Sequence, residues 1–362
     1  MSEKTSKLIL PIVLTTLLFV GGLGLALYSL PVVATFLLLI LILLFKRKAI
    51  ILPRGFYPYL IFLFFSALSL FWSVDKKESL RFLFIFISSG LFWIMAFNYK
   101  KELYAHFEKL LVFLGLAYGL LFFVLVVTGT PIPGWGIYSF TSHYQNHNHI
   151  GDLWGVVLLV PVYNLLRKRK NFPNLLLLGT GLFFLLISLS RSAYLSFAVA
   201  LTFLLIRLGI LPKFRRVFIF AVIISVALFI YASLVKPTFE TRIYFIQALL
   251  GFRYYPFGVG LGNFSVISKM FEGPIFGLAS YSIYVHNIAL EAISGLGILG
   301  LSFVFWLFSA VEDVFKSSKQ NIIFASVFIF LLVNFLFDRT YVVPSMLWLW
   351  FMALGLAQKS NA

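Results

Sequence analysis

The most constraining feature of this sequence is a series of long apolar runs separated by short charged or Gly/Pro-rich segments. Most of the runs approach the ~20 residues that a helix needs to cross a bilayer. Because a segment isolated in lipid must satisfy its own backbone hydrogen bonds, each run is predicted to form a helix. The runs lie near residues 8–28, 30–45, 56–72, 81–97, 109–128, 150–166, 174–190, 193–208, 217–235, 286–310, 321–337 and 341–357. The sequence therefore predicts an all-α, polytopic membrane protein with about twelve transmembrane helices in a single integral membrane domain, residues 1–362.

The composition agrees with a membrane environment. Hydrophobic residues make up 61% of the chain and charged residues 11%, whereas a soluble domain has about 25% charged residues. The net charge of +17 would suggest a nucleic-acid partner in a soluble protein, but the basic residues are spread over separate loops. We therefore expect membrane lipids as partners and no nucleic acid. The first run is interpreted as a retained span rather than a signal peptide, because no A-x-A-like cleavage signal follows it.

The Lys and Arg residues alternate between rich and poor loops along the chain, which orients the spans by the positive-inside rule. Both termini are predicted to be cytoplasmic. The outer side receives Lys76, Lys77, Arg81, Arg191, Lys236, Arg242, Arg253, Lys269 and Arg339.

Two outer segments differ from the short turns that join the other runs. Residues 129–149 contain no Lys or Arg but hold three of the five histidines. Residues 236–285 form the longest stretch between spans and are rich in Tyr, Phe and Gly. A loop of this length in a compact domain is usually functional or disordered. Its low charge favours an ordered, partly helical loop between helices 9 and 10.

Several outer residues could carry chemistry. Arg191 lies in a short outer turn between two apolar helices, where a cation is costly unless it is paired or functional. Snorkelling to lipid headgroups is the alternative for Arg191, an ion pair with Glu240 is the alternative for Arg242, and interfacial anchoring is the alternative for Arg253.

His286 lies where the long outer loop re-enters the membrane. The positive character of the helix N-terminus should disfavour its imidazolium form. A neutral imidazole is what a general base needs, and a capping or packed histidine is the alternative.

Two further patterns have features of ligand sites, one for a zinc ion and one for a nucleotide. His147, His149 and Asp152 have zinc-ligand chemistry, but Asp152 is equally explained as a first-turn acid of a helix that Asn148 caps. The glycine-rich stretch Gly258–Gly262 follows no βαβ pattern, so it does not predict nucleotide binding.

Taken together, several motifs resemble those of the O-antigen ligase and polymerase superfamily, over residues 146–301. They are Asn146-His147-Asn148-His149-Ile150-Gly151, Ser188-Leu189-Ser190-Arg191-Ser192, Thr241-Arg242, Tyr255-Pro256-Phe257-Gly258-Val259-Gly260-Leu261-Gly262-Asn263-Phe264, and His286-Asn287 followed by Gly295-Leu296-Gly297-Ile298-Leu299-Gly300-Leu301. The resemblance implies an inverting, metal-independent glycosyltransferase without a cofactor, at the outer face of the bacterial inner membrane.

The resemblance also implies roles for individual residues. A ligase of this family moves a glycan from undecaprenyl diphosphate to a sugar hydroxyl of the lipid A core. Arg191 and Arg242 would hold the diphosphate, and His286 would take the proton of the acceptor hydroxyl. The substrate contacts are expected to include Arg253, Asn287, His147 and Asn148. Residues 236–285 would form the outer active-site loop.

Two alternatives stay open. A polymerase would use a second lipid-linked repeat as acceptor, and the compact loop between Arg242 and His286 leaves the acceptor undecided. A lipid-linked sugar flippase would need ionisable groups near the membrane midplane or inverted repeats. The apolar runs are almost devoid of charge, which favours the transferase.

Overall fold

The molecule is a bundle of helices. The computed structural model describes residues 10–18, 34–35, 37–42, 50–128, 147–167, 172–210, 240–275, 278–279, 281–317 and 321–359, together with the single positions 212, 219 and 223. The predicted all-α class is confirmed, since the described residues are almost entirely helical apart from one short strand pair. The α-helices are α3 (Phe56–Leu68), α4 (Lys76–Asn98), α5 (Lys100–Thr128), α6 (His147–Leu166), α7 (Phe172–Ile187), α8 (Arg191–Arg207), α10 (Glu240–Tyr254), α11 (Phe264–Met270), α12 (Ile288–Leu296), α13 (Leu301–Ser317), α14 (Ile322–Phe335) and α15 (Pro344–Ala357).

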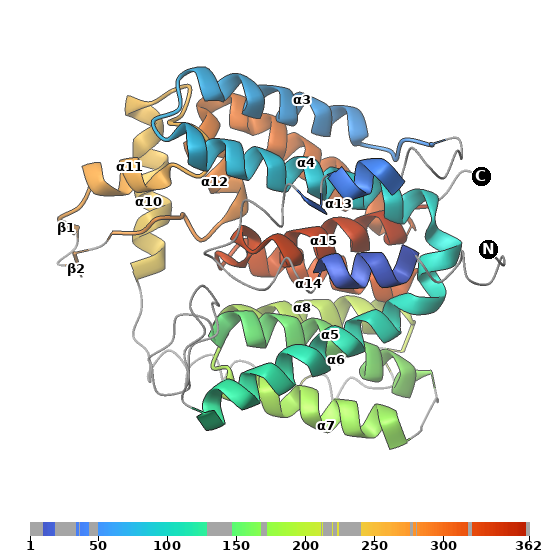
Figure 1. Ribbon diagram of the computed structural model, residues 1–362. Helices are drawn as coiled ribbons and strands as arrows, with labels where there is room; N and C mark the ends of the chain where they lie inside the picture. The colour runs from blue at the N-terminus through green and yellow to red at the C-terminus, as the bar shows by residue number, and fades with distance from the viewer. Residues whose placement is uncertain are drawn as a thin grey trace.

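Short elements complete the fold. Three 3-10 helices are η1 (Ser69–Phe71), η2 (Gly297–Gly300) and η3 (Thr340–Val342). The strands β1 (Pro274–Ile275) and β2 (Leu278–Ala279) pair antiparallel, with Pro274 opposite Ala279. The predicted partly helical character of residues 236–285 is confirmed in the described part of this segment, which contains α10 and α11. Figure 1 shows these two helices and the strand pair at one end of the bundle, which we call the α10 end.

Within the described part of the chain, three helical segments are long and apolar enough to cross a membrane: Lys76–Asn98, Asn148–Leu166 and Ile288–Ser317. Four shorter apolar helices accompany them, at Phe56–Phe71, Phe172–Ile187, Ile322–Phe335 and Pro344–Ala357. The predicted runs near 8–28, 30–45 and 217–235 lie largely outside the described residues. Each of the other predicted runs coincides with helix in the structure.

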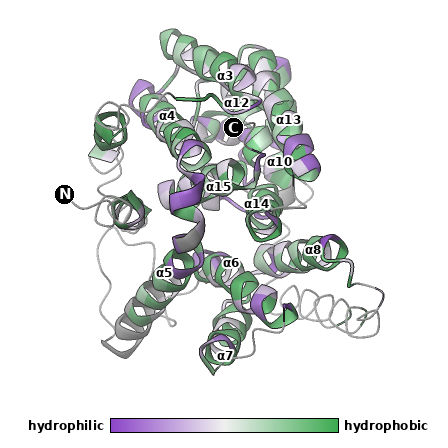
Figure 2. Ribbon diagram, turned by 90° about the vertical axis from the view of Figure 1, so that its right-hand side faces the viewer, coloured by the Kyte–Doolittle hydropathy of each residue, from purple (hydrophilic) through white to green (hydrophobic). Residues whose placement is uncertain are grey.

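The helices α14 and α15 form the centre of the bundle. Figures 1 and 2 show them between one group that contains α3, α4 and α13 and another that contains α5, α6, α7 and α8. In Figure 2 most residues of these helices have the colour of hydrophobic residues. Because α14 and α15 are apolar on every side, they are stable only when they are surrounded by other helices or by lipid.

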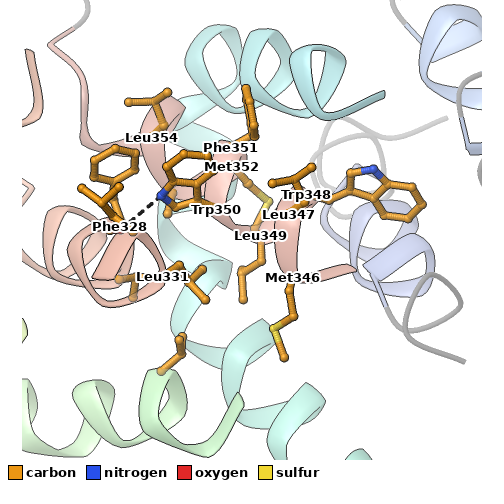
Figure 3. Packing of buried hydrophobic residues seen from close by; sticks show 14 of the residues in the cluster. Phe328, Leu331, Met346, Leu347, Trp348, Leu349, Trp350, Phe351, Met352 and Leu354 are labelled. Carbon is orange, nitrogen blue, oxygen red and sulfur yellow. Dashed lines mark hydrogen bonds between the residues drawn. The ribbon is translucent and has the colours of Figure 1, made fainter. Parts of the chain in front are cut away.

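Large aromatic side chains fill the space around α15. The Trp350 indole N–H donates to the backbone oxygen of Phe328 on α14, at 3.2 Å, and the two rings stack 5.3 Å apart (Figure 3). Phe351 stacks on Trp306 of α13 with ring centroids 5.0 Å apart. These contacts bury the indole polar atom of Trp350 with a partner, as the interior requires.

Two salt bridges lie near opposite ends of α4. At the start of α4, Arg81 forms a salt bridge with Glu78 at 2.5 Å. Beyond the other end of α4, Arg54 pairs with Asp313 at 3.3 Å, and the Gln358 amide donates to the backbone oxygen of Arg54 at 3.0 Å. The predicted outer and inner cations among these residues therefore lie near opposite ends of α4.

Two helix boundaries differ from the prediction. The run predicted from residue 109 begins at Lys100, because Leu103, Phe107 and Leu110 continue a buried stripe through the charged segment. The run predicted over 286–310 begins at Ile288, is interrupted by η2, and continues as α13 to Ser317.

The interruption at η2 seats the glycine-rich part of the outer loop against α12. Gly297 has φ 59°, and its backbone lies against the loop, where a Cβ would come within 1.9 Å of the Pro256 backbone oxygen. The Gly260 N–H donates to the Gly295 oxygen at 2.8 Å, and the Ile298 N–H donates to the Pro256 oxygen at 2.8 Å. This loop therefore fastens α10 and α11 to the bundle.

We expect Gly297→Ala to destabilise the protein. The backbone conformation alone costs a non-glycine residue about 1–3 kcal/mol, and the added methyl meets backbone that cannot move without breaking these hydrogen bonds. Thermal unfolding in detergent should show a lower Tm. Gly179→Ala on α7 is the control, because its Cβ meets nothing within 4 Å; equal Tm values for the two variants would contradict the prediction.

Candidate functional site

A group of polar side chains lies where the starts of α6 and α8 meet the segment between α14 and η3. We call it the Asp338 cluster, and its members are Asn148, Arg191, Ser192, Asp338 and Arg339. The Asn148 amide donates to Asp338 Oδ2 at 2.5 Å, and the Ser192 hydroxyl donates to the same oxygen at 3.1 Å. The backbone N–H of Arg339 donates to Asp338 Oδ1 at 2.6 Å. One buried carboxylate thus joins three separate segments of the chain.

The electrostatics of Asp338 reflect its burial and its basic neighbours. Burial is the largest influence and raises the pKa of this carboxyl. The backbone N–H and the charge of Arg339, then the Ser192 hydrogen bond and the charge of Arg191, act in the opposite direction. Both guanidinium groups therefore lie close enough to Asp338 to act on it.

The serine-rich motif places Arg191 at this cluster. Leu189 has φ 48°, which marks a sharp turn between α7 and α8. The Ser190 side chain then caps α8 by accepting from the Ala193 N–H at 3.3 Å. Arg191 is the first residue of α8 and is half-buried. The motif thus builds a tight turn that presents a guanidinium beside Asp338.

A second buried carboxylate lies beneath the cluster. Asn334 of α14 donates to Asp152 Oδ1 at 2.6 Å, and its own Oδ1 accepts from the Thr340 hydroxyl. Asp152 is fully buried, so it serves the packing of α6 on α14 rather than an exposed first helical turn. Among the described residues no group of three His, Asp or Glu side chains could hold a metal ion.

His286 lies directly before α12 and is held in an uncommon backbone conformation. Its φ is 63°, which is strained for a residue with a side chain. The imidazole is half-buried and stacks on Tyr244 of α10 with ring centroids 5.6 Å apart. Burial and then the charge of Arg339 lower the pKa of His286 to about 3. The direction of this shift agrees with the predicted neutral imidazole, and burial is its main cause.

Asn287 holds the turn that carries His286. Its Oδ1 accepts from the Leu290 N–H at 2.9 Å and caps α12, while its Nδ2 donates to the Leu336 backbone oxygen at 3.0 Å. This second bond links the start of α12 to the end of α14. The side chain therefore positions the turn, and contact between Asn287 and substrate stays a prediction.

Glu291 supports the same turn from below. It is 3% exposed, and its Oε2 accepts from the Val285 N–H at 2.9 Å and from the Tyr341 hydroxyl at 2.8 Å. Val285 is adjacent to His286, and Tyr341 belongs to η3, which follows Arg339. One carboxyl thus joins the His286 segment to the Arg339 segment.

For two of the remaining predicted site residues, the structure describes the backbone position but not the side chain. Position 242 lies in the first turn of α10 and His147 begins α6, but the side chains of Arg242 and His147 lie outside the described residues. Arg253 is exposed in the last turn of α10, about 16 Å along the helix from position 242. The structure thus brings Arg191 and Asn148 together at Asp338, and the charge of Arg339 links this cluster to His286.

Sequence reasoning missed Asp338, Arg339, Asn334 and Glu291 as members of the site. The signal for Asn334 and Glu291 was a polar side chain inside an apolar run, which is costly in lipid. The signal for the Asp338–Arg339 pair was an acid and a base together in the short link between the last two runs. No known protein family matches the chain, and no curated protein is detectably similar to it in sequence.

Proposed function

We propose that this protein is a membrane glycosyltransferase that moves a glycan from undecaprenyl diphosphate to a sugar hydroxyl of the lipid A core. The observation that carries the proposal is the neutral imidazole of His286 near the half-buried Arg339, whose charge acts on Asp338 together with that of the half-buried Arg191. A neutral imidazole suits proton removal from a hydroxyl, and guanidinium groups suit phosphate oxygens. The order of the sequence motifs adds support for this class of reaction.

The reaction needs one bond formed and one broken. The acceptor hydroxyl oxygen attacks the anomeric carbon of the donor sugar, and the bond from that carbon to the phosphate oxygen breaks with its electron pair on the diphosphate. His286 takes the hydroxyl proton and passes it to the departing diphosphate or to water. Arg191 and Arg242 stabilise the charge that develops on the leaving group. Attack opposite the diphosphate inverts the configuration.

The proposal includes a membrane arrangement. The bundle lies in the bacterial inner membrane with about twelve spans, both termini in the cytoplasm and the α10 end in the periplasm. The position of Arg81 and Arg54 near opposite ends of α4 supports this arrangement, as do three helical segments of membrane-crossing length. The lipid tail of the donor would then stay in the bilayer while its diphosphate reaches Arg191.

The test is a transfer reaction with purified protein in nanodiscs. Undecaprenyl-diphosphate glycan is supplied with lipid A core and lipid-linked repeat as competing acceptors, and products are separated by mass. Glycosylated lipid A core with release of undecaprenyl diphosphate is the expected outcome. Glycan extension on the lipid-linked repeat would identify a polymerase instead. Movement of the donor across the bilayer without covalent change would replace the transferase with a flippase.

Arg191→Lys is expected to lower kcat/KM for glycan transfer about tenfold while the protein stays folded. An ammonium keeps the charge beside Asp338 but cannot reproduce the planar fork on phosphate, so about one charge-assisted hydrogen bond is lost. Arg207→Lys is the matched control, since Arg207 donates to the Phe315 backbone oxygen at the opposite end of the bundle, at 2.8 Å. Equal rates for both variants would remove Arg191 from the proposed clamp.

A further inference from the structure

Arg339 lies next to Asp338 in sequence, but its guanidinium forms no salt bridge among the described residues. Its side chain is half-buried between α14 and η3. The neighbouring Asp338 carboxylate is occupied by Asn148, Ser192 and the backbone N–H of Arg339 itself. A half-buried cation of this kind is costly unless it meets an anion.

The charge of Arg339 reaches the candidate base. It is the second influence, after burial, that lowers the pKa of His286. The titratable and charged groups around His286 come from several elements. They are Tyr244 on α10, Arg339 before η3, Tyr341 on η3, Glu291 on α12 and Tyr284 on the same segment as His286. The Tyr284 hydroxyl also forms hydrogen bonds with Glu78 and Arg81 of α4. Of these, Arg339 is the cation whose field acts directly on the imidazole.

The position of Arg339 suits one ligand chemistry. Arg191 and Arg339 both act on Asp338 from different segments, so two guanidinium groups lie around this carboxylate. Guanidinium forks bind phosphate oxygens in pairs, and they act more strongly where water is excluded. A diphosphate placed there would supply the missing negative charge and would lie next to His286.

We propose that Arg339 is a further phosphate-binding residue of this site, beside the Asp338 carboxylate that joins it to the starts of α6 and α8. The proposal rests on the proposed function for its choice of undecaprenyl diphosphate as the natural ligand. An anion on Arg339 offsets the positive field at the imidazole, so protonation of His286 becomes easier when donor is present. His286 would therefore be a stronger base when diphosphate is bound than when it is absent.

The first test measures binding of undecaprenyl diphosphate to the full-length protein in detergent. Arg339→Gln is expected to weaken the Kd about 10- to 100-fold, as expected for loss of hydrogen bonds to a charged group. Lys269→Gln is the matched control, because Lys269 is an exposed cation on α11 at the same end of the bundle, and its Kd should equal that of the unsubstituted protein. An unchanged Kd in Arg339→Gln would overturn the proposal.

The second test follows protonation of His286 in the unsubstituted protein, so a folding defect in Arg339→Gln cannot affect its result. The fraction of imidazolium at pH 5 is read from the histidine ring proton resonances, with His286→Asn identifying the signal. Undecaprenyl diphosphate should raise this fraction, about tenfold for each unit by which the pKa rises. Undecaprenol, which lacks the diphosphate, should leave it unchanged. No response to undecaprenyl diphosphate would overturn the proposal.

The source of the phosphate is separated by two further additions. Inorganic diphosphate should reproduce the His286 response at higher concentration, whereas phosphatidylglycerol should not. An equal response to phosphatidylglycerol would mean that the site takes any anionic headgroup, and would overturn the assignment to diphosphate. If the diphosphate response is present but no glycan is transferred, the proposed function fails while the phosphate site stands.

Discussion

Replacing His286 with alanine should abolish measurable glycan transfer, with a loss of about 10²- to 10⁴-fold in kcat, the usual contribution of a positioned general base. The alanine side chain cannot take the hydroxyl proton, and no other imidazole is placed in this turn among the described residues. The measurement is single-turnover transfer with donor in excess of its Kd. The binding of undecaprenyl diphosphate should persist, because Arg191, Arg242 and Arg339 remain.

The matched control is His106→Ala on α5, which removes an imidazole outside the site. Its rate should equal that of the unsubstituted protein. Full activity in His286→Ala would remove the proposed base and leave the site as an anion-binding cluster. Loss of activity in both variants would point to a general effect on the bundle and would contradict the specific role of His286.

The low pKa of His286 fixes the expected pH dependence. An ordinary histidine, with a pKa near 6.5, is mostly protonated at pH 5, but His286 with a pKa of about 3 stays neutral. The pH profile of kcat/KM, which reports the free enzyme, should therefore show no acid limb from His286 between pH 7 and 5. Because the folded pKa lies below the unfolded value, His286 costs no stability above pH 6.5 and progressively destabilises the fold as the pH falls toward about 3.

Asp338→Ala is expected to lower transfer about 10²-fold or more and to lower the Tm. The substitution leaves the Asn148 amide, the Ser192 hydroxyl and the Arg339 N–H without their shared acceptor, and it removes the carboxylate between Arg191 and Arg339. Small displacements of such groups cost about 10²-fold in rate. The measurements are kcat/KM for transfer and thermal unfolding in detergent.

Asp313→Ala provides the comparison for Asp338→Ala. Asp313 is also buried, and it pairs with Arg54 and accepts from Gln358 at the opposite end of the bundle. Both substitutions should lower the Tm, but only Asp338→Ala should lower the rate of the protein that remains folded. Equal specific rates in the two folded variants would contradict a role for the Asp338 cluster in positioning Arg191 and Arg339.

The sequence predicts local features of this protein well. Apolar runs predict the helices because, in a segment shielded from water, hydropathy and helix formation have the same cause. The serine-rich motif around Arg191 and the turn at His286 were identified from residue chemistry and order, and the structure joins Arg191 and Asn148 through Asp338. Arg81 and Arg54, one from each predicted group of cations, also lie near opposite ends of α4.

Contacts between residues far apart in the chain could not be predicted from the sequence. Asp338 is 190 residues from Asn148 along the chain, and nothing in the local pattern of either residue indicates the other. Glu291 and Asn334 are polar residues in apolar runs. Their sequence position indicates that burying them is energetically costly, but it does not indicate which residues they contact. The role of the glycine-rich stretch at 258–262 depended likewise on its packing against α12, which only the fold defines.

The hydrogen bonds of Glu291 have a consequence for how such a protein could diversify. They fasten the segment of His286 to the segment of Arg339, so a mutation that moves one segment also displaces the other. Tyr254 on α10 and Met270 on α11 are exposed, and among the described residues their side chains make no hydrogen bond to the turn that carries His286. Substitutions at these exposed positions can therefore accumulate independently, whereas changes in the His286 segment and the Arg339 segment must remain compatible with each other.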